Sequence, residues 1–248
     1  SYPLLRGKCP GCGARFSPTY ALVELAMAGL GVLCFYHAKG FADGDPWLLL
    51  AHFFAEITFC ATFASLALID LKTWILPDRI TYPAVFFFWG VAVSLGRLSW
   101  GDALAGAGLG FGSLAAIILG YKWLTGRDGM GWGDAKLLAV SGAFLGWQAL
   151  PMIILLAAVQ GLMAAVVLVV TRTSLEPTEP YLPLEGEDEE DQKNQEQLHQ
   201  EAENDKEEEP GDEASWRQIA MPFGPFLVLA SLEALFFGSQ FMERLVGL

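Results

Sequence analysis

Long apolar runs separated by short polar segments make up most of this sequence of 248 residues. A helix needs about 20 apolar residues to cross a bilayer, and tilted or short helices depart somewhat from that length. Six runs approach this length and a seventh, at residues 135–150, is shorter; the six span residues 20–37, 47–69, 80–96, 103–121, 151–171 and 222–241. The pattern therefore predicts an all-α, polytopic transmembrane helical bundle with about seven spans.

Most of the negative charge lies in one segment. Hydrophobic residues make up 53% of the chain and charged residues only 17%, as expected for a membrane protein, yet the net charge is −13. Residues 176–213 hold 17 acidic residues, two lysines and few large apolar side chains, so they cannot bury enough surface to fold alone. We expect residues 174–215 to form a disordered acidic loop in the cytosol, either a solvated spacer or a site for a basic partner. Such a loop would repel nucleic acid.

The lysines and arginines are divided unevenly between the two sides of the predicted bundle. If seven spans alternate, one side receives most of them and the other only Lys39, Arg97 and Arg244. Because cytoplasmic segments are enriched in positive residues, we expect the chain to begin in the cytoplasm and to end outside. The resulting parts are a cytoplasmic segment (1–19), a transmembrane core (20–173), the acidic loop (174–215) and a last transmembrane segment (216–248).

Two aspartates lie at the cytoplasmic edge of this predicted bundle. Asp70 follows the second span, in "LIDLKTWILPDRIT", and Asp134 follows the fourth, in "GMGWGDAK". Each adjoins a long apolar helix, where a carboxylate is costly unless it is paired or used. Taken singly, each has an ordinary structural explanation. Asp134 would be the N-cap of a helix beginning at Ala135, and Asp70 an interfacial residue like Asp78.

As a pair, the two aspartates indicate aspartic-protease chemistry. Two carboxylates held close together cannot both ionise easily and share a proton, so one activates a water while the other protonates the scissile carbonyl. The glycines at positions 129, 131 and 133 would allow an extended peptide to approach the backbone. A membrane-edge aspartate pair with an adjacent peptide-binding glycine segment is therefore our preferred hypothesis.

Other residues with chemical potential receive no catalytic role. The glycines of segment 106–112 have the spacing that lets two helices approach closely, so we assign them to packing. Glu56, inside the second span, is a functional suspect by its position, but the sequence suggests no task for it. The remaining candidates are assigned to packing or to no function; they are Cys34, Cys60, His37, His52 and His199.

Several motifs resemble those of one family. "GWGDAK" resembles the G-x-G-D-x-K signature of the bacterial type IV prepilin peptidases, and "LIDLKTWILPDRIT" resembles their I-D-x-x-x-x-x-L-P-D-x-x-T segment. The segments "GKCPGC", "YALVELAMA" and "MPFGPFLVLA" agree as well. The resemblance implies a GxGD-type aspartyl endopeptidase of the bacterial inner membrane with Asp70 and Asp134 as its catalytic pair. Its substrates would be type IV prepilins or type II secretion pseudopilins, whose basic leader is removed at the cytoplasmic face.

The resemblance also implies a second activity. Many members methylate the new N-terminus with S-adenosylmethionine and carry two C-x-x-C pairs that would form a structural zinc site. This sequence contains one such pair, Cys9 and Cys12, and begins with Ser1, so we expect it to be an N-terminally incomplete or processed chain. Zinc and S-adenosylmethionine are therefore expected only in the intact protein, and proteolysis needs neither.

Four further residues are expected to support the pair, namely Gly131, Gly133, Lys136 and Asp78. Lys136 is a candidate anchor for a substrate carboxylate, because the resemblance implies a glutamate shortly after the cut in prepilins. Asp134, at a helix N-terminus, is expected to be the base, and Asp70, near a helix C-terminus, the acid.

Three rival functions remain open. A presenilin-like intramembrane aspartyl protease also has a G-x-G-D motif, but its other aspartate typically follows a tyrosine, whereas Asp70 follows "LI". A small cation transporter would have acidic residues spread through the depth of the bilayer, and Glu56 is the one deep acid that we identify. A methyltransferase alone would leave Asp70 and Asp134 without a task.

Overall fold

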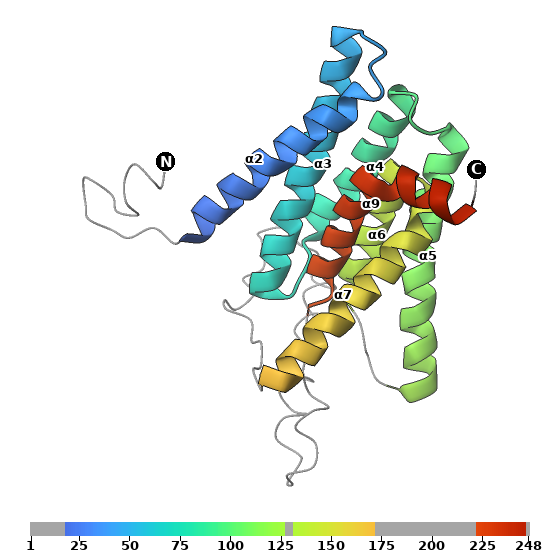
Figure 1. Cartoon of the computed structure of the whole chain (residues 1–248). Helices are drawn as coiled ribbons and strands as arrows, with labels where there is room; N and C mark the ends of the chain where they lie inside the picture. Colours follow the sequence, from blue (N-terminus) through green and yellow to red (C-terminus); the bar gives the residue numbers. More distant parts are fainter. Residues whose placement is uncertain (1–17, 127–130, 172–221, 247–248) are drawn as a thin grey trace.

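The computed structural model describes residues 18–126, 131–171 and 222–246, with side chains from residue 19 to residue 238 within these ranges. These residues form seven α-helices and one short 3-10 helix, and they include no β-strand. The helices are α2 (Pro18–Lys39), α3 (Pro46–Thr73), α4 (Asp78–Ser94), α5 (Trp100–Thr125), α6 (Trp132–Leu145), η1 (Trp147–Ala149), α7 (Leu150–Thr171) and α9 (Gly224–Val246). The predicted all-α bundle is confirmed (Figure 1).

Every predicted apolar run corresponds to a helix, but the helices differ in length. Among the described residues, four are long and apolar enough to cross a membrane: α2, α3, α5 and α7 together with η1. The helix α4 has 17 residues and α6 has 14, whereas α9 has 23, with its side chains described as far as Gly238. The prediction of about seven spans therefore also depends on α4, α6 and α9, of which α4 and α6 are shorter than a typical span.

The ends of the long helices follow local sequence signals. The helix α3 begins where the Asp45 side chain accepts a hydrogen bond from the Trp47 amide at 2.9 Å, and Pro46 occupies the first turn. It ends at Trp74, which has a left-handed backbone with φ of 59°. Because α3 continues to Thr73, Asp70 lies in its last turn.

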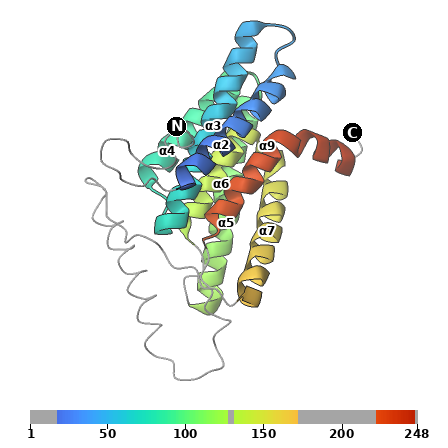
Figure 2. The same ribbon diagram turned by 60° about the vertical axis from the view of Figure 1, so that its left-hand side comes forward.

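The short helix α6 lies at the centre of the bundle. Ten of its fourteen residues are buried, because α4, α5 and α9 pack around it (Figures 1 and 2). On α5, a Cβ at Gly106 would overlap the backbone of Gly142, and a Cβ at Gly110 would come within 2.5 Å of the Leu138 carbonyl oxygen. The predicted packing role of the glycines in segment 106–112 is thus confirmed for these two.

Buried contacts fix α3 and α9 against α6. The ring of Phe59 on α3 stacks on Phe144 of α6 with centroids 4.7 Å apart. Ser141 of α6 and Ser231 of α9 share a buried hydrogen bond of 2.8 Å. These contacts pack α3 and α9 against α6, and the end of α3 and the starts of α6 and α9 meet where Gly224 lies against Asp70 and Asp134.

Candidate active site

Asp70 is buried where α3 ends. Asp70 is 4% exposed. Its backbone carbonyl accepts a hydrogen bond of 2.8 Å from the Trp74 amide, which closes the last turn of the helix. The side-chain oxygen Oδ2 is buried and has no hydrogen-bond partner among the described residues. A buried polar atom without a partner is costly and is a common feature of reactive sites.

Asp134 lies in the first turn of α6 and is 7% exposed. The sequence offered an N-cap role for it, before a helix beginning at Ala135, and that explanation is wrong. The helix begins at Trp132, its N-cap is Gly131, and no side chain caps it. Asp134 is therefore a residue of the first helical turn and not the N-cap.

The carboxyl groups of the two aspartates both lie close to Gly224, the first residue of α9. A Cβ built on Gly224 would overlap Oδ2 of Asp70 and would lie 3.0 Å from its Cγ. The same Cβ would lie 3.6 Å from Oδ1 of Asp134. Both carboxyl groups thus reach the same backbone position, and the sequence reasoning identified Gly224 only as part of "MPFGPFLVLA".

The predicted supporting residues join α6 to the connection between α3 and α4. A Cβ on Gly133 would lie 2.8 Å from Cδ1 of Leu76, so this glycine lets the start of α6 pack on Leu76. Lys136 of α6 forms an ion pair with Asp78 at the start of α4, and its ammonium lies 5.0 Å from the ring centre of Tyr82. Gly129 lies outside the described residues, and Gly131 is the N-cap of α6.

Comparisons with known proteins identify the family that this chain resembles. A model of the type IV leader peptidase family matches residues 57–166, and a model of the bacterial peptidase A24 N-terminal domain matches residues 1–38. A prepilin leader peptidase/N-methyltransferase of Aeromonas hydrophila is 39% identical over 192 residues, which cover 75% of this chain and 62% of the relative. A protein of the same name from Burkholderia pseudomallei is 33% identical over 255 aligned residues, which cover 100% of this chain and 64% of the relative.

The chain belongs to the type IV leader peptidase family. The predicted resemblance is therefore confirmed, and the family match includes Asp70 and Asp134 but stops short of Gly224. The chain spans slightly less than two thirds of the length of these peptidase/methyltransferase relatives. No solved structure shows a significant similarity to it.

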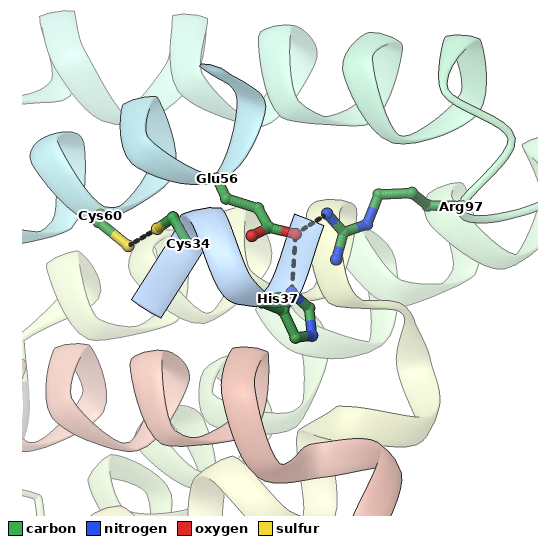
Figure 3. Close-up of polar contacts among 5 residues, drawn as sticks. All are labelled: Cys34, His37, Glu56, Cys60 and Arg97. Atoms are coloured by element: carbon green, nitrogen blue, oxygen red, sulfur yellow. Dashed lines mark hydrogen bonds and ion pairs between the residues drawn. The ribbon is translucent and has the colours of Figure 1, made fainter. Parts of the chain in front are cut away.

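A second polar cluster lies far from the aspartates of this leader peptidase family member. Oε1 of Glu56 accepts hydrogen bonds from Nδ1 of His37 at 2.8 Å and from Nη1 of Arg97 at 2.7 Å (Figure 3). The Arg97 guanidinium lies 4.9 Å from the ring centres of both Phe41 and Phe144. Fourteen residues of α3 separate Glu56 from Asp70, or about 21 Å along the helix. We therefore interpret the cluster as a structural contact that joins α2, α3 and the connection between α4 and α5.

Neither the partners of Glu56 nor a role for a second membrane acid, Glu233, was predicted from the sequence. His37 and Arg97 lie 19 and 41 residues from Glu56 along the chain, so no local spacing indicated them. Glu233 of α9 accepts a hydrogen bond from Gln160 of α7 at 2.8 Å. Both acids therefore have donors from neighbouring helices.

The cysteines and histidines of the described residues form no metal site. No group of three or more His, Cys, Asp or Glu residues there is arranged to hold a metal ion. Cys34 and Cys60 pack together in the core with their sulfur atoms 3.7 Å apart, as expected for packing residues. Cys9, Cys12, His199 and the acidic loop lie outside the described residues.

Proposed function

We propose that this chain is a membrane aspartyl endopeptidase that removes the basic leader of type IV prepilins or type II secretion pseudopilins. The observation that carries the proposal is the convergence of Asp70 and Asp134 on Gly224. The relatives named prepilin leader peptidase/N-methyltransferase support the same substrate class. We place the reaction at the cytoplasmic face of the bacterial inner membrane, because the charge distribution predicts that both aspartates lie on that side.

The mechanism follows from two carboxyl groups that share one proton. The ionised carboxylate takes a proton from a water molecule, whose oxygen bonds to the scissile carbonyl carbon. The protonated carboxyl gives its proton to the carbonyl oxygen, which yields a neutral tetrahedral diol. The diol then collapses and the C–N bond breaks: the proton first taken from water passes to the leaving amine, and one diol hydroxyl returns its proton to the other carboxylate as the carbonyl re-forms. Asp70 and Asp134 are thus restored with one proton between them.

The order of acid and base stays a prediction. Asp134 in the first turn of α6 is favoured as the charged form by the helix dipole, in line with its expected role as base. Asp70 lies in the last turn of α3 but also faces the N-terminal turn of α9 at Gly224, so two helix ends act on it in opposite directions. Asp70 is therefore assigned as the acid only because Asp134 is expected to be the base.

Substitution of the aspartates tests the proposal. Asp70→Asn and Asp134→Asn are each expected to lower cleavage of a prepilin by at least about 100-fold, because general acid or base catalysis is lost. Asp78→Asn, a matched control on the same membrane edge, is expected to keep substantial activity. The readout is the intact mass of the substrate after incubation with purified protein whose membrane insertion is verified. Equal loss in all three variants would mean either that the carboxylates act in folding or that Asp70 and Asp134 are not the catalytic pair.

Lys136 is proposed to anchor a substrate carboxylate. Its ammonium is already paired with Asp78, so a substrate acid would bind beside or in place of that partner. Lys136→Ala is expected to raise the Michaelis constant for a prepilin by about tenfold, as for loss of one charge-assisted contact, with little change in kcat. Unchanged kinetics together with a lower melting temperature would show that Lys136 only joins α6 to α4.

Two further proposals concern regions outside the described residues. Zinc binding by Cys9 and Cys12, and methylation with S-adenosylmethionine, are carried over from the family and stay predictions.

A cation relay is not favoured by the described acids, because Glu56 and Glu233 each accept hydrogen bonds from fixed donors on neighbouring elements.

A further inference from the structure

An apolar groove opens beside the aspartate pair. It has a volume of about 270 Å³ and lies between α3, α7 and the start of α9. Its walls include Leu71 of α3, Val167 and Leu168 of α7, and Pro222 and Pro225 at the start of α9. All of the side chains that line it are apolar, so it offers no side-chain hydrogen bond to a ligand.

The groove shares its walls with the candidate active site. Leu71 directly follows Asp70, and Pro225 directly follows Gly224, the backbone position that both carboxyl groups reach. The α7 wall lies in the last two turns of that helix, which ends at Thr171. Figure 1 shows that this end of α7 and the start of α9 lie toward the same end of the bundle. A chain that crosses the aspartate pair thus meets the groove within a few residues.

The chemistry of the groove suits side chains better than backbone. Proline has no amide N–H, so two of the wall residues cannot donate a backbone hydrogen bond to an extended strand. The volume is slightly below the roughly 300–1,000 Å³ of small-molecule sites, so the groove accommodates a few side chains rather than a whole helix. Its occupant is therefore a short apolar stretch held by close packing.

We propose that this groove binds the first apolar side chains after the scissile bond of the substrate and thereby sets the register of cleavage. The inference rests on the proposed function, because the resemblance to the prepilin peptidases implies a cut directly before the apolar helix of the substrate. With these side chains seated between Leu71 and Val167, the preceding peptide bond lies over Asp70 and Asp134. The groove thus selects substrates in which an apolar segment directly follows the cut.

Two neighbouring valines of α7 provide a matched test. Val167 lines the groove and is 58% exposed, whereas Val166 is 54% exposed and does not line it. Val167→Trp fills the groove and is expected to raise the Michaelis constant for a full-length prepilin by at least about tenfold, with kcat within about twofold of the unsubstituted chain. Val166→Trp is expected to leave both constants within about twofold. Equal Michaelis constants for the two variants would overturn the proposal that the groove binds the substrate.

Photo-crosslinking keeps the test decisive if a tryptophan variant folds poorly. With benzoylphenylalanine at position 167, the crosslink is expected in the first apolar turn of the substrate, and with the same probe at 166 it is expected to be absent. A crosslink from position 167 only to lipid, or to a second copy of this chain, would overturn the proposal. Failure of the unsubstituted chain to cut any prepilin would contradict the proposed function instead, so the two failures are distinguishable.

Discussion

At the scale of single residues, Gly224 decides how the candidate catalytic pair is assembled. The sequence motifs predicted Asp70 and Asp134, because a carboxylate beside a long apolar run is conspicuous. They gave no reason to place Gly224 against the pair, since it lies 90 residues from Asp134 along the chain. A close approach of backbone to a side chain leaves no signature in local sequence except the glycine itself.

The space at Gly224 yields a prediction. Gly224→Ala is expected to lower kcat by about 100-fold with little change in the Michaelis constant, because the new Cβ displaces the Asp70 carboxyl while the groove stays intact. Gly238→Ala in the same helix is the control, since a Cβ there meets no described atom within 4 Å. Steady-state kinetics on a prepilin, with melting curves of both variants, provide the measurement. A fully active Gly224→Ala protein would show that Asp70 has room to move without loss of function.

At the scale of elements, α6 shows where sequence reasoning succeeded and where it failed. The short apolar run at 135–150 predicted a helix, and one exists. The helix begins at Trp132, three residues before the predicted start. The glycines at 131 and 133 were interpreted as a turn, but Gly133 lies within the helix and packs on Leu76. Its end was placed too far along, because Gly146, with φ of 87°, terminates the helix before η1.

The link between α2, α3 and the segment after α4 yields a second prediction. Arg97→Ala leaves the fully buried Glu56 with His37 alone, and breaking a buried ion pair in this way costs about 3–5 kcal/mol. The variant is therefore expected to melt at a markedly lower temperature in detergent. Lys39→Ala, at the exposed end of α2, is expected to change the melting temperature little.

A double variant separates the ion pair from simple packing. Replacing both partners, as in Glu56→Met with Arg97→Met, removes the unpaired buried charge and is expected to recover much of the lost stability. If the double variant melts no higher than Arg97→Ala, the cluster contributes through the shape of its side chains and the ion-pair interpretation is wrong.

At the scale of the whole molecule, the two polar centres lie apart along α3. The aspartate pair lies where α3 ends and where α6 and α9 begin. Along the chain, Lys72 and Arg79 follow Asp70 within ten residues, and Lys136 lies two residues after Asp134. Glu56 and Arg97 lie about four helical turns away. That the aspartates face the cytoplasm stays a prediction from the charge distribution of the sequence.

The fold class was predictable from hydrophobic periodicity, whereas the side-by-side order of the helices was not. Apolar runs fix where helices form, and lipid-facing and protein-facing apolar residues look alike in a sequence. The glycines of α5 indicated close packing, but the partner helix α6 became evident only in the structure. The acidic loop and the Cys9–Cys12 pair lie outside the described residues, so those predictions stand as they were.

The most direct test of leader cleavage is the intact mass of a prepilin after incubation with the purified, detergent-solubilised chain. We predict a product shortened by its basic leader, and no such product when Asp70 or Asp134 is changed to asparagine. An added methyl group on the product would also reveal the second activity of the family. A prepilin of unchanged mass, in the presence of protein that is folded and monodisperse, would contradict the account.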